Sequence, residues 1–241
     1  GIFGVENNKK DCIQKLEEIV KDDPRLEVAE LMTKYPQGGE RQLIYAVTGR
    51  SINSAMLPAD AGCIVDNVET LVAIYNAVKF GKPVMNRIFT VTGDAVSDPR
   101  NFYVCTGTNF QEILDAAGGC KLPPEKMIAG GPMMGFSMFG LDIPTTKTSS
   151  SLLCLAKDDV AASETTACIN CGRCVSACPE QIIPTRLAKM AGHGDMAGFE
   201  KWNGMECIEC GSCSYICPAK IPLAQSIRTM KKQILAERRK K

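Results

Sequence analysis

CINCGRCVSACP, at residues 168–179, is repeated as CIECGSCSYICP at residues 207–218. Each copy contains three cysteines separated by two residues, a fourth cysteine after three more residues, and then a proline. This spacing is typical of [4Fe–4S] sites in which one loop supplies three thiolates and the fourth cysteine of each run ligates the cluster of the other run. The repeat therefore predicts two clusters and indicates electron transfer. The predicted ligands are Cys168, Cys171, Cys174 and Cys217 for cluster 1, and Cys207, Cys210, Cys213 and Cys178 for cluster 2.

Two other uses of cysteine explain this pattern less well. Disulfides stabilise small secreted domains, but the opening sequence GIFGVENNKK lacks the basic segment and apolar core of a signal peptide. A zinc ion needs four ligands, which two Cys-x2-Cys pairs could supply. Zinc does not account for the third cysteine at the next step, or for the fourth followed by proline, in both copies. A structural zinc-binding interaction module stays open as an alternative of another functional class.

The composition limits the class of protein. Of the 241 residues, 45% are hydrophobic, as is ordinary for globular proteins, so two or three domains are expected. The formal net charge of +1 gives no general attraction to nucleic acid, and no nucleic-acid partner is predicted. No stretch approaches 18 uninterrupted apolar residues, so no membrane-spanning helix is predicted. Thirteen cysteines without an export signal indicate a reducing compartment.

The first part of the chain predicts an α/β domain, because strand and helix patterns alternate. Proline and glycine mark the boundaries between these patterns. The predicted elements are a strand at 2–5, a helix capped by Asn7 or Asn8, a strand at 26–32, a helix from the glycine-rich turn 35–40 to Gly49, and an amphipathic helix at 68–80.

The rest of the chain divides into two further parts. Residues 88–156 show short strand patterns and one helix pattern at 110–117, which predict a small module rich in β-structure. Residues 157–241 begin with a polar linker and contain the cysteine runs, a helical connection between them and a terminal helix. The predicted domains are therefore 1–87, 88–156 and 157–241.

Two short motifs in the first domain are candidates for binding a flavin. Gly38-Gly39-Glu40 precedes a helix, where backbone N–H groups can hold a phosphate, although a plain turn is the simpler interpretation. Asn67 either caps the following helix or reaches a flavin ring or phosphate. No catalytic acid or base is predicted, because one-electron transfer needs none. Most cysteines outside the runs are expected to be small core residues: Cys12, Cys63, Cys105, Cys120 and Cys154.

Three stretches of the chain resemble the C subunit of the Rnf electron-transport complex. The paired cysteine runs resemble its ferredoxin-type domain, and residues 129–135, AGGPMMG, resemble its SLBB module. Residues 35–40, YPQGGE, and 66–70, DNVET, resemble the flavin-binding domain that it shares with the flavoprotein subunit of respiratory complex I. The resemblance implies a fold of class α/β plus α+β. It comprises a partial flavin-binding α/β domain, a small SLBB β-grasp-like module and a helical ferredoxin-type two-cluster domain.

The resemblance also implies a function. The family is an ion-translocating ferredoxin:NAD oxidoreductase, which uses FMN, NAD(H) and two [4Fe–4S] clusters and couples electron flow to Na⁺ or H⁺ transport. The implied flavin contacts are Gly38, Gly39, Glu40 and Asn67. The implied partners are the other membrane subunits and, indirectly, ferredoxin, and the implied location is peripheral, on the cytoplasmic face of the cell membrane. A soluble flavin and iron–sulfur reductase, such as a cobalamin reductase, resembles the same family and stays an alternative.

The first residues suggest a fragment of a longer protein. The sequence GIFGV at residues 1–5 reads as a strand with no initiator Met before it. The glycine-rich flavin loop that the family carries at its N-terminal end is missing from the sequence. We therefore expect this chain to keep both clusters, to bind FMN weakly or not at all, and to lack NADH activity by itself.

Overall fold

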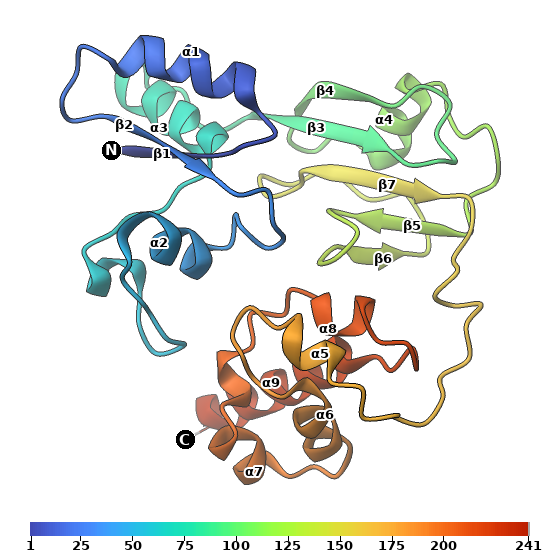
Figure 1. Ribbon diagram of the computed structural model, residues 1–241. Helices are drawn as coiled ribbons and strands as arrows, with labels where there is room; N and C mark the ends of the chain where they lie inside the picture. The colour runs from blue at the N-terminus through green and yellow to red at the C-terminus, as the bar shows by residue number, and fades with distance from the viewer. Residues whose placement is uncertain (241) are drawn as a thin grey trace. The chain divides into compact units, whose positions relative to one another are not determined.

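The computed structural model describes residues 1–240 (Figure 1). These residues form two compact units, Gly1–Asn67 and the chain from Val68 onward. Each unit is built around its own short sheet. Within residues 1–240, no helix is long and apolar enough to cross a membrane.

The first unit contains a parallel β-α-β arrangement. Strands β1 (Ile2–Glu6) and β2 (Glu27–Leu31) pair in parallel, and α1 (Lys10–Val20) connects them. Because parallel strands need a crossover, the helix predicted between the two strands is the element that permits this pairing. Helix α2 (Glu40–Thr48) ends where Gly49 adopts a left-handed conformation with φ of 70°, as glycine after a helix commonly does. A short 3₁₀ helix, η1 (Pro58–Ala61), follows.

The predicted cap of α1 is wrong. The residue before the helix is Lys9, and no side chain caps the helix there. Asn7 lies further upstream, and its carbonyl oxygen accepts hydrogen bonds from the backbone N–H of Thr33 at 3.1 Å and from its hydroxyl at 2.8 Å. Asn7 therefore fastens the end of β1 to the segment that follows β2.

Helix α3 (Val68–Phe80) forms over the predicted residues, but its apolar face is not covered. Within the described part of the chain no residue of α3 is buried, and Val78 is 83% exposed. The helix is held through its first turn, where Glu69 pairs with Arg87 at 2.7 Å and accepts from the N–H of Ile88 at 2.8 Å. The periodicity of a sequence indicates that a helix has an apolar face, and it carries no information about what covers that face.

The second unit begins with a five-stranded mixed sheet in the order β4-β3-β7-β5-β6 (Figure 1). Strands β3 and β7 are parallel and the other pairs are antiparallel. Helix α4 (Phe110–Ala116) contributes to the core of the sheet, where Phe110 meets Phe89 edge to face with ring centroids 5.2 Å apart. The strands are β3 (Asn86–Thr92), β4 (Arg100–Cys105), β5 (Lys126–Ala129), β6 (Phe136–Met138) and β7 (Ser151–Leu155).

The C-terminal part is helical. Helix α6 packs against α9, and α7 packs against α6, around a core that includes Leu187, Phe199 and Ile227, all fully buried. Proline stands at the first position of α6 and just before α9, where the missing N–H costs nothing. The helices are α5 (Arg173–Ser176), α6 (Pro184–Gly192), α7 (Met196–Lys201), η2 (Gly204–Glu206), α8 (Ser212–Tyr215) and α9 (Leu223–Lys240).

The two cysteine runs repeat in backbone conformation as well as in sequence. A residue in the left-handed region occurs at two matching positions within each run and at a third, two residues after the proline that ends the run. The short helix inside each run, α5 or α8, contacts the other. The matched left-handed pairs are Asn170 and Glu209, Gly172 and Gly211, and Gln181 and Lys220.

Candidate metal centre

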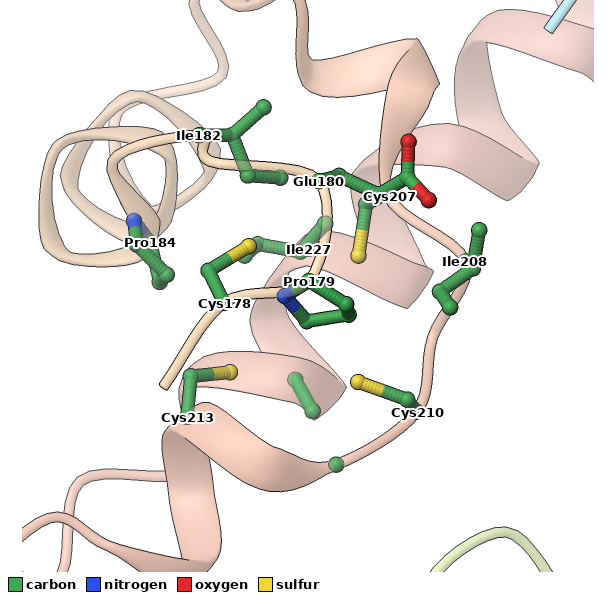
Figure 2. Close-up of a pocket in the computed structure, with 12 residues that line it drawn as sticks. Cys178, Pro179, Glu180, Ile182, Pro184, Cys207, Ile208, Cys210, Cys213 and Ile227 are labelled. Atoms are coloured by element: carbon green, nitrogen blue, oxygen red, sulfur yellow. The ribbon is translucent and has the colours of Figure 1, made fainter. Parts of the chain in front are cut away.

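Four cysteine thiols line one pocket in the helical part of the chain. The pocket encloses about 340 Å³, its open mouth included. Figure 2 shows the four sulfur atoms directed toward the same space from different segments. Three cysteines come from the second run, and the fourth comes from the first run. They are Cys207, Cys210, Cys213 and Cys178, the set predicted for cluster 2.

The wall of this pocket is mostly apolar. Ile182 and Pro184 approach from the segment that begins α6, and Ile227 approaches from α9. Ile182 is 8% exposed and Ile227 is fully buried. Such a wall excludes water from one side of the pocket, which is a means of controlling the redox potential of a bound group.

Three of the four pocket thiols have raised pKa values, so a bound cation is needed to stabilise their thiolate form. Burial raises the pKa of the Cys178 and Cys207 thiols. Burial, together with the neighbouring thiols of Cys207 and Cys210, raises the pKa of Cys213 to about 12. The raised pKa values disfavour the thiolate form of these three cysteines, whereas bound iron stabilises that form.

The four residues predicted for cluster 1 are less enclosed. Cys174 and Cys217 are buried and belong to one apolar cluster with Leu223, which places a cysteine of the second run near one of the first. Cys171 is exposed and Cys168 is half-buried, with its Sγ 3.7 Å from Oδ1 of Asn170. The two ligand sets stay predictions, and the set for cluster 2 has the stronger geometric support.

The cysteine geometry favours a group larger than a single ion. A tetrahedral zinc site requires sulfur atoms at about 2.3 Å from one metal. Among the described residues, no three His, Cys, Asp or Glu side chains are gathered closely enough to hold one metal ion. Four thiols nevertheless surround one pocket, as a cluster of four irons that each bind one thiolate needs. The donor set therefore fits a [4Fe–4S] cluster.

The predicted flavin residues lie at the beginnings of two helices. Gly39 directly precedes α2, and the nearest atom to a Cβ at this position would be Oε1 of Gln42, the end of a flexible side chain that can move aside. Nothing lies within 4 Å of the position where Gly38 would carry a Cβ, which leaves its backbone accessible. Glu40 opens α2, and the exposed Asn67 immediately precedes α3.

The expectation for the remaining cysteines is only partly correct. Cys154 is buried in the sheet core, where burial and the neighbouring Cys120 raise its pKa to about 12. Cys12 and Cys105, in contrast, are exposed. Each lies on the solvent side of an amphipathic element, α1 or β4, and an apolar neighbourhood in sequence does not distinguish the two sides.

Sequence reasoning missed three charged residues, one inside the second run and two on the terminal helix. They are Glu209, Arg228 and Lys231, of which the last donates a hydrogen bond to the carbonyl oxygen of Cys207 at 2.5 Å. Two signals were available: an acidic residue inside a cysteine run, and two basic residues three apart on the terminal helix.

The chain matches three protein families in sequence. Residues 1–76 match the Nuo51 FMN-binding domain, residues 88–137 the SLBB domain, and residues 167–221 the 4Fe-4S dicluster domain. The fold is also similar to two crystal structures of an NAD⁺-reducing [NiFe]-hydrogenase, in the H2-reduced and air-oxidised states. The TM-scores are 0.56 and 0.57 at 16% and 17% identity, and the matches cover 98% and 96% of this chain and 47% and 48% of those chains. The chain therefore combines a flavin-binding domain with a dicluster iron–sulfur domain, as the sequence predicts.

The chain is also similar to three curated C subunits. The C subunit of the Na⁺-translocating ferredoxin:NAD⁺ oxidoreductase complex of Acetobacterium woodii is 47% identical over 100% of this chain and 54% of its own length. The C subunit of the proton-translocating complex of Clostridium ljungdahlii is 45% identical over 95% of this chain and 50% of its own. A third relative, the C subunit of the ion-translocating oxidoreductase complex of Vibrio cholerae, is 38% identical over 77% of this chain and 24% of its own. The chain is similar to these C subunits over most or all of its residues, and it spans about half the length of the first two relatives.

Proposed function

We propose that this chain is the electron-relay part of the C subunit of an ion-translocating ferredoxin:NAD⁺ oxidoreductase. The observation that carries the proposal is the pocket lined by four thiols from both runs, in a chain related to these subunits over its whole length. The clusters supply one-electron redox chemistry when bound. The contribution of the chain is to place the two sets of thiols in one small domain and to exclude water from one side of the pocket.

The flavin, the partners and the location follow from the same proposal. Gly38, Gly39, Glu40 and Asn67 would contribute to the FMN site of the longer protein, because they lie within the residues that match the FMN-binding domain. The partners would be the other subunits of the complex, with ferredoxin reached indirectly, and the chain would lie peripherally on the cytoplasmic face of the membrane. The names of two relatives assign different coupling ions, Na⁺ and protons, at 47% and 45% identity, so the coupling ion is left open.

The relay can be tested in the full-length protein. When NADH is added anaerobically to the full-length protein loaded with iron and FMN, electron paramagnetic resonance should show reduced [4Fe–4S] clusters. Replacing Cys207 and Cys213 with alanine should remove part of that signal, because both thiols line the cluster pocket. Reduction of cobalamin at a comparable rate would favour the soluble reductase instead. Stoichiometric zinc without a cluster signal would contradict both redox functions.

A further inference from the structure

Three charged side chains meet at the loop that joins Cys207 to Cys210. One belongs to the loop itself and two belong to α9. Nε of Arg228 donates to Oε2 of Glu209 at 2.7 Å. Nζ of Lys231 donates to the carbonyl oxygen of Cys207 at 2.5 Å and lies 3.6 Å from Oε1 of Glu209. The side chains of this Glu209 network (Glu209, Arg228 and Lys231) are between 15% and 26% exposed, so water and salt screen their charges only partly.

The first cysteine run has no counterpart of this acid. The matching position is Asn170, which has nearly the same backbone conformation, with φ of 54° against 59° for Glu209. Asparagine adopts this left-handed region readily, and glutamate much less so. Glu209 is thus held in a conformation that suits it poorly, by two cations on α9. In this conformation its N–H donates to Sγ of Cys207 at 3.4 Å.

The network itself carries one net positive charge, because two cations surround one carboxylate, and Glu180 adds a separate carboxylate to the lining of the cluster 2 pocket. Reduction of a [4Fe–4S] cluster adds one electron from the reductant and breaks no bond, so the cluster becomes more negative by one charge. A nearby positive charge stabilises this reduced form, and a nearby negative charge destabilises it. The first run contains one cation, Arg173. Its side chain is exposed, so water and salt screen its charge.

We propose that Lys231 and Glu209 are positioning residues that set the reduction potential of cluster 2 in opposite directions. Lys231 raises the potential, and Glu209 lowers it while its N–H and its ion pairs hold the ligand loop. Arg228 holds Glu209 in place. This inference rests on the proposed ligation of cluster 2 and deepens the proposed relay, because it makes the two clusters unequal as electron carriers.

Two charge-removing variants test the proposal by the sign of their effects. Purified chain loaded with iron and sulfide would be titrated anaerobically with dithionite, and both clusters followed by electron paramagnetic resonance. At a fixed potential, Lys231→Met should lower the ratio of reduced to oxidised cluster 2 roughly threefold to tenfold. Glu209→Gln should raise it by a similar factor, and tenfold corresponds to 59 mV for a one-electron couple. Cluster 1 should change much less in both variants.

The neighbouring Lys232 provides a matched control. It is exposed on the same helix, so Lys232→Met removes the same charge and should change the ratio less than twofold. Lys231→Arg keeps the positive charge and should leave the reduction potential of cluster 2 close to that of the unmodified chain. Equal effects of the Lys231→Met and Lys232→Met variants would overturn the proposal, and so would shifts of the same sign in Lys231→Met and Glu209→Gln.

The proposal stays testable if the Lys231→Met variant does not assemble cluster 2. If Lys231→Met fails to assemble the cluster, Glu209→Gln carries the test, and a negative shift or no shift in that variant overturns the inference. Absence of iron from the unmodified chain is a different result. It would contradict the proposed function itself, since no cluster would exist whose potential could be compared.

Discussion

Replacing Cys178 with alanine is expected to remove cluster 2, although Cys178 belongs to the first cysteine run. Its thiol lines the same pocket as three thiols of the second run. A [4Fe–4S] cluster that loses one thiolate loses a full iron–thiolate bond inside a mostly apolar pocket, and no other thiol lines that pocket. The iron content should fall from about eight to about four per chain. The remaining electron paramagnetic resonance spectrum should be that of cluster 1.

The reciprocal variants identify which cluster is lost. Cys178→Ala and Cys210→Ala should leave the same spectrum, although they change different runs. Cys217→Ala and Cys171→Ala should leave the other spectrum. Cys12→Ala is the control, because this cysteine is exposed on α1 and far from the runs in sequence, and it should keep both signals. If Cys178→Ala matched Cys171→Ala, each run would bind its own cluster, and the crossed ligation would be wrong.

Replacing Ile227 with alanine is expected to destabilise the helical domain and to expose cluster 2. Ile227 is fully buried, packs with Leu187 and Phe199 in the core of this domain, and also lines the thiol pocket. Removing its buried methyl and methylene groups should lower the free energy of unfolding by about 2–5 kcal/mol. The cavity also opens the cluster to water and oxygen, so the cluster absorbance should decay several-fold faster in air.

Leu235 offers a control on the same helix. It is 42% exposed, so Leu235→Ala removes a side chain of similar size from a place that contributes little to the core. Its effect on anaerobic urea unfolding should stay below about 1 kcal/mol. An unfolding free energy and an air-decay rate unchanged by Ile227→Ala would show that this residue neither supports the domain nor protects the pocket.

The four thiols that line the candidate metal centre could be predicted together from the sequence. The repeated spacing specifies loop geometry and ligand type together, because a cubane needs three thiolates on one short loop and a fourth from elsewhere. The crossed set Cys178 with Cys207, Cys210 and Cys213 was predicted from this spacing, and the structure brings these four residues together. Strands and helices bounded by proline or glycine, such as α2 before Gly49, were predicted correctly for a similar reason: the boundary signal is local.

What could not be predicted depends on contacts between distant segments. Asn7 bonds with Thr33 instead of capping α1, because the parallel pairing of β1 with β2 brings those residues together. The exposed apolar face of α3 has the periodicity of a buried one. Lys231 lies 24 residues after Cys207, and only the return of α9 along the second run places its charge at that loop. Local patterns contain none of this information.

The most direct test of the central claim is the anaerobic content of iron and acid-labile sulfide in the purified chain, with spectra of the dithionite-reduced protein. Two clusters held by eight cysteines predict about eight irons and eight sulfides per chain, and two overlapping [4Fe–4S] signals. Stoichiometric zinc, or iron without labile sulfide, would contradict the claim that the doubled cysteine run is an electron relay.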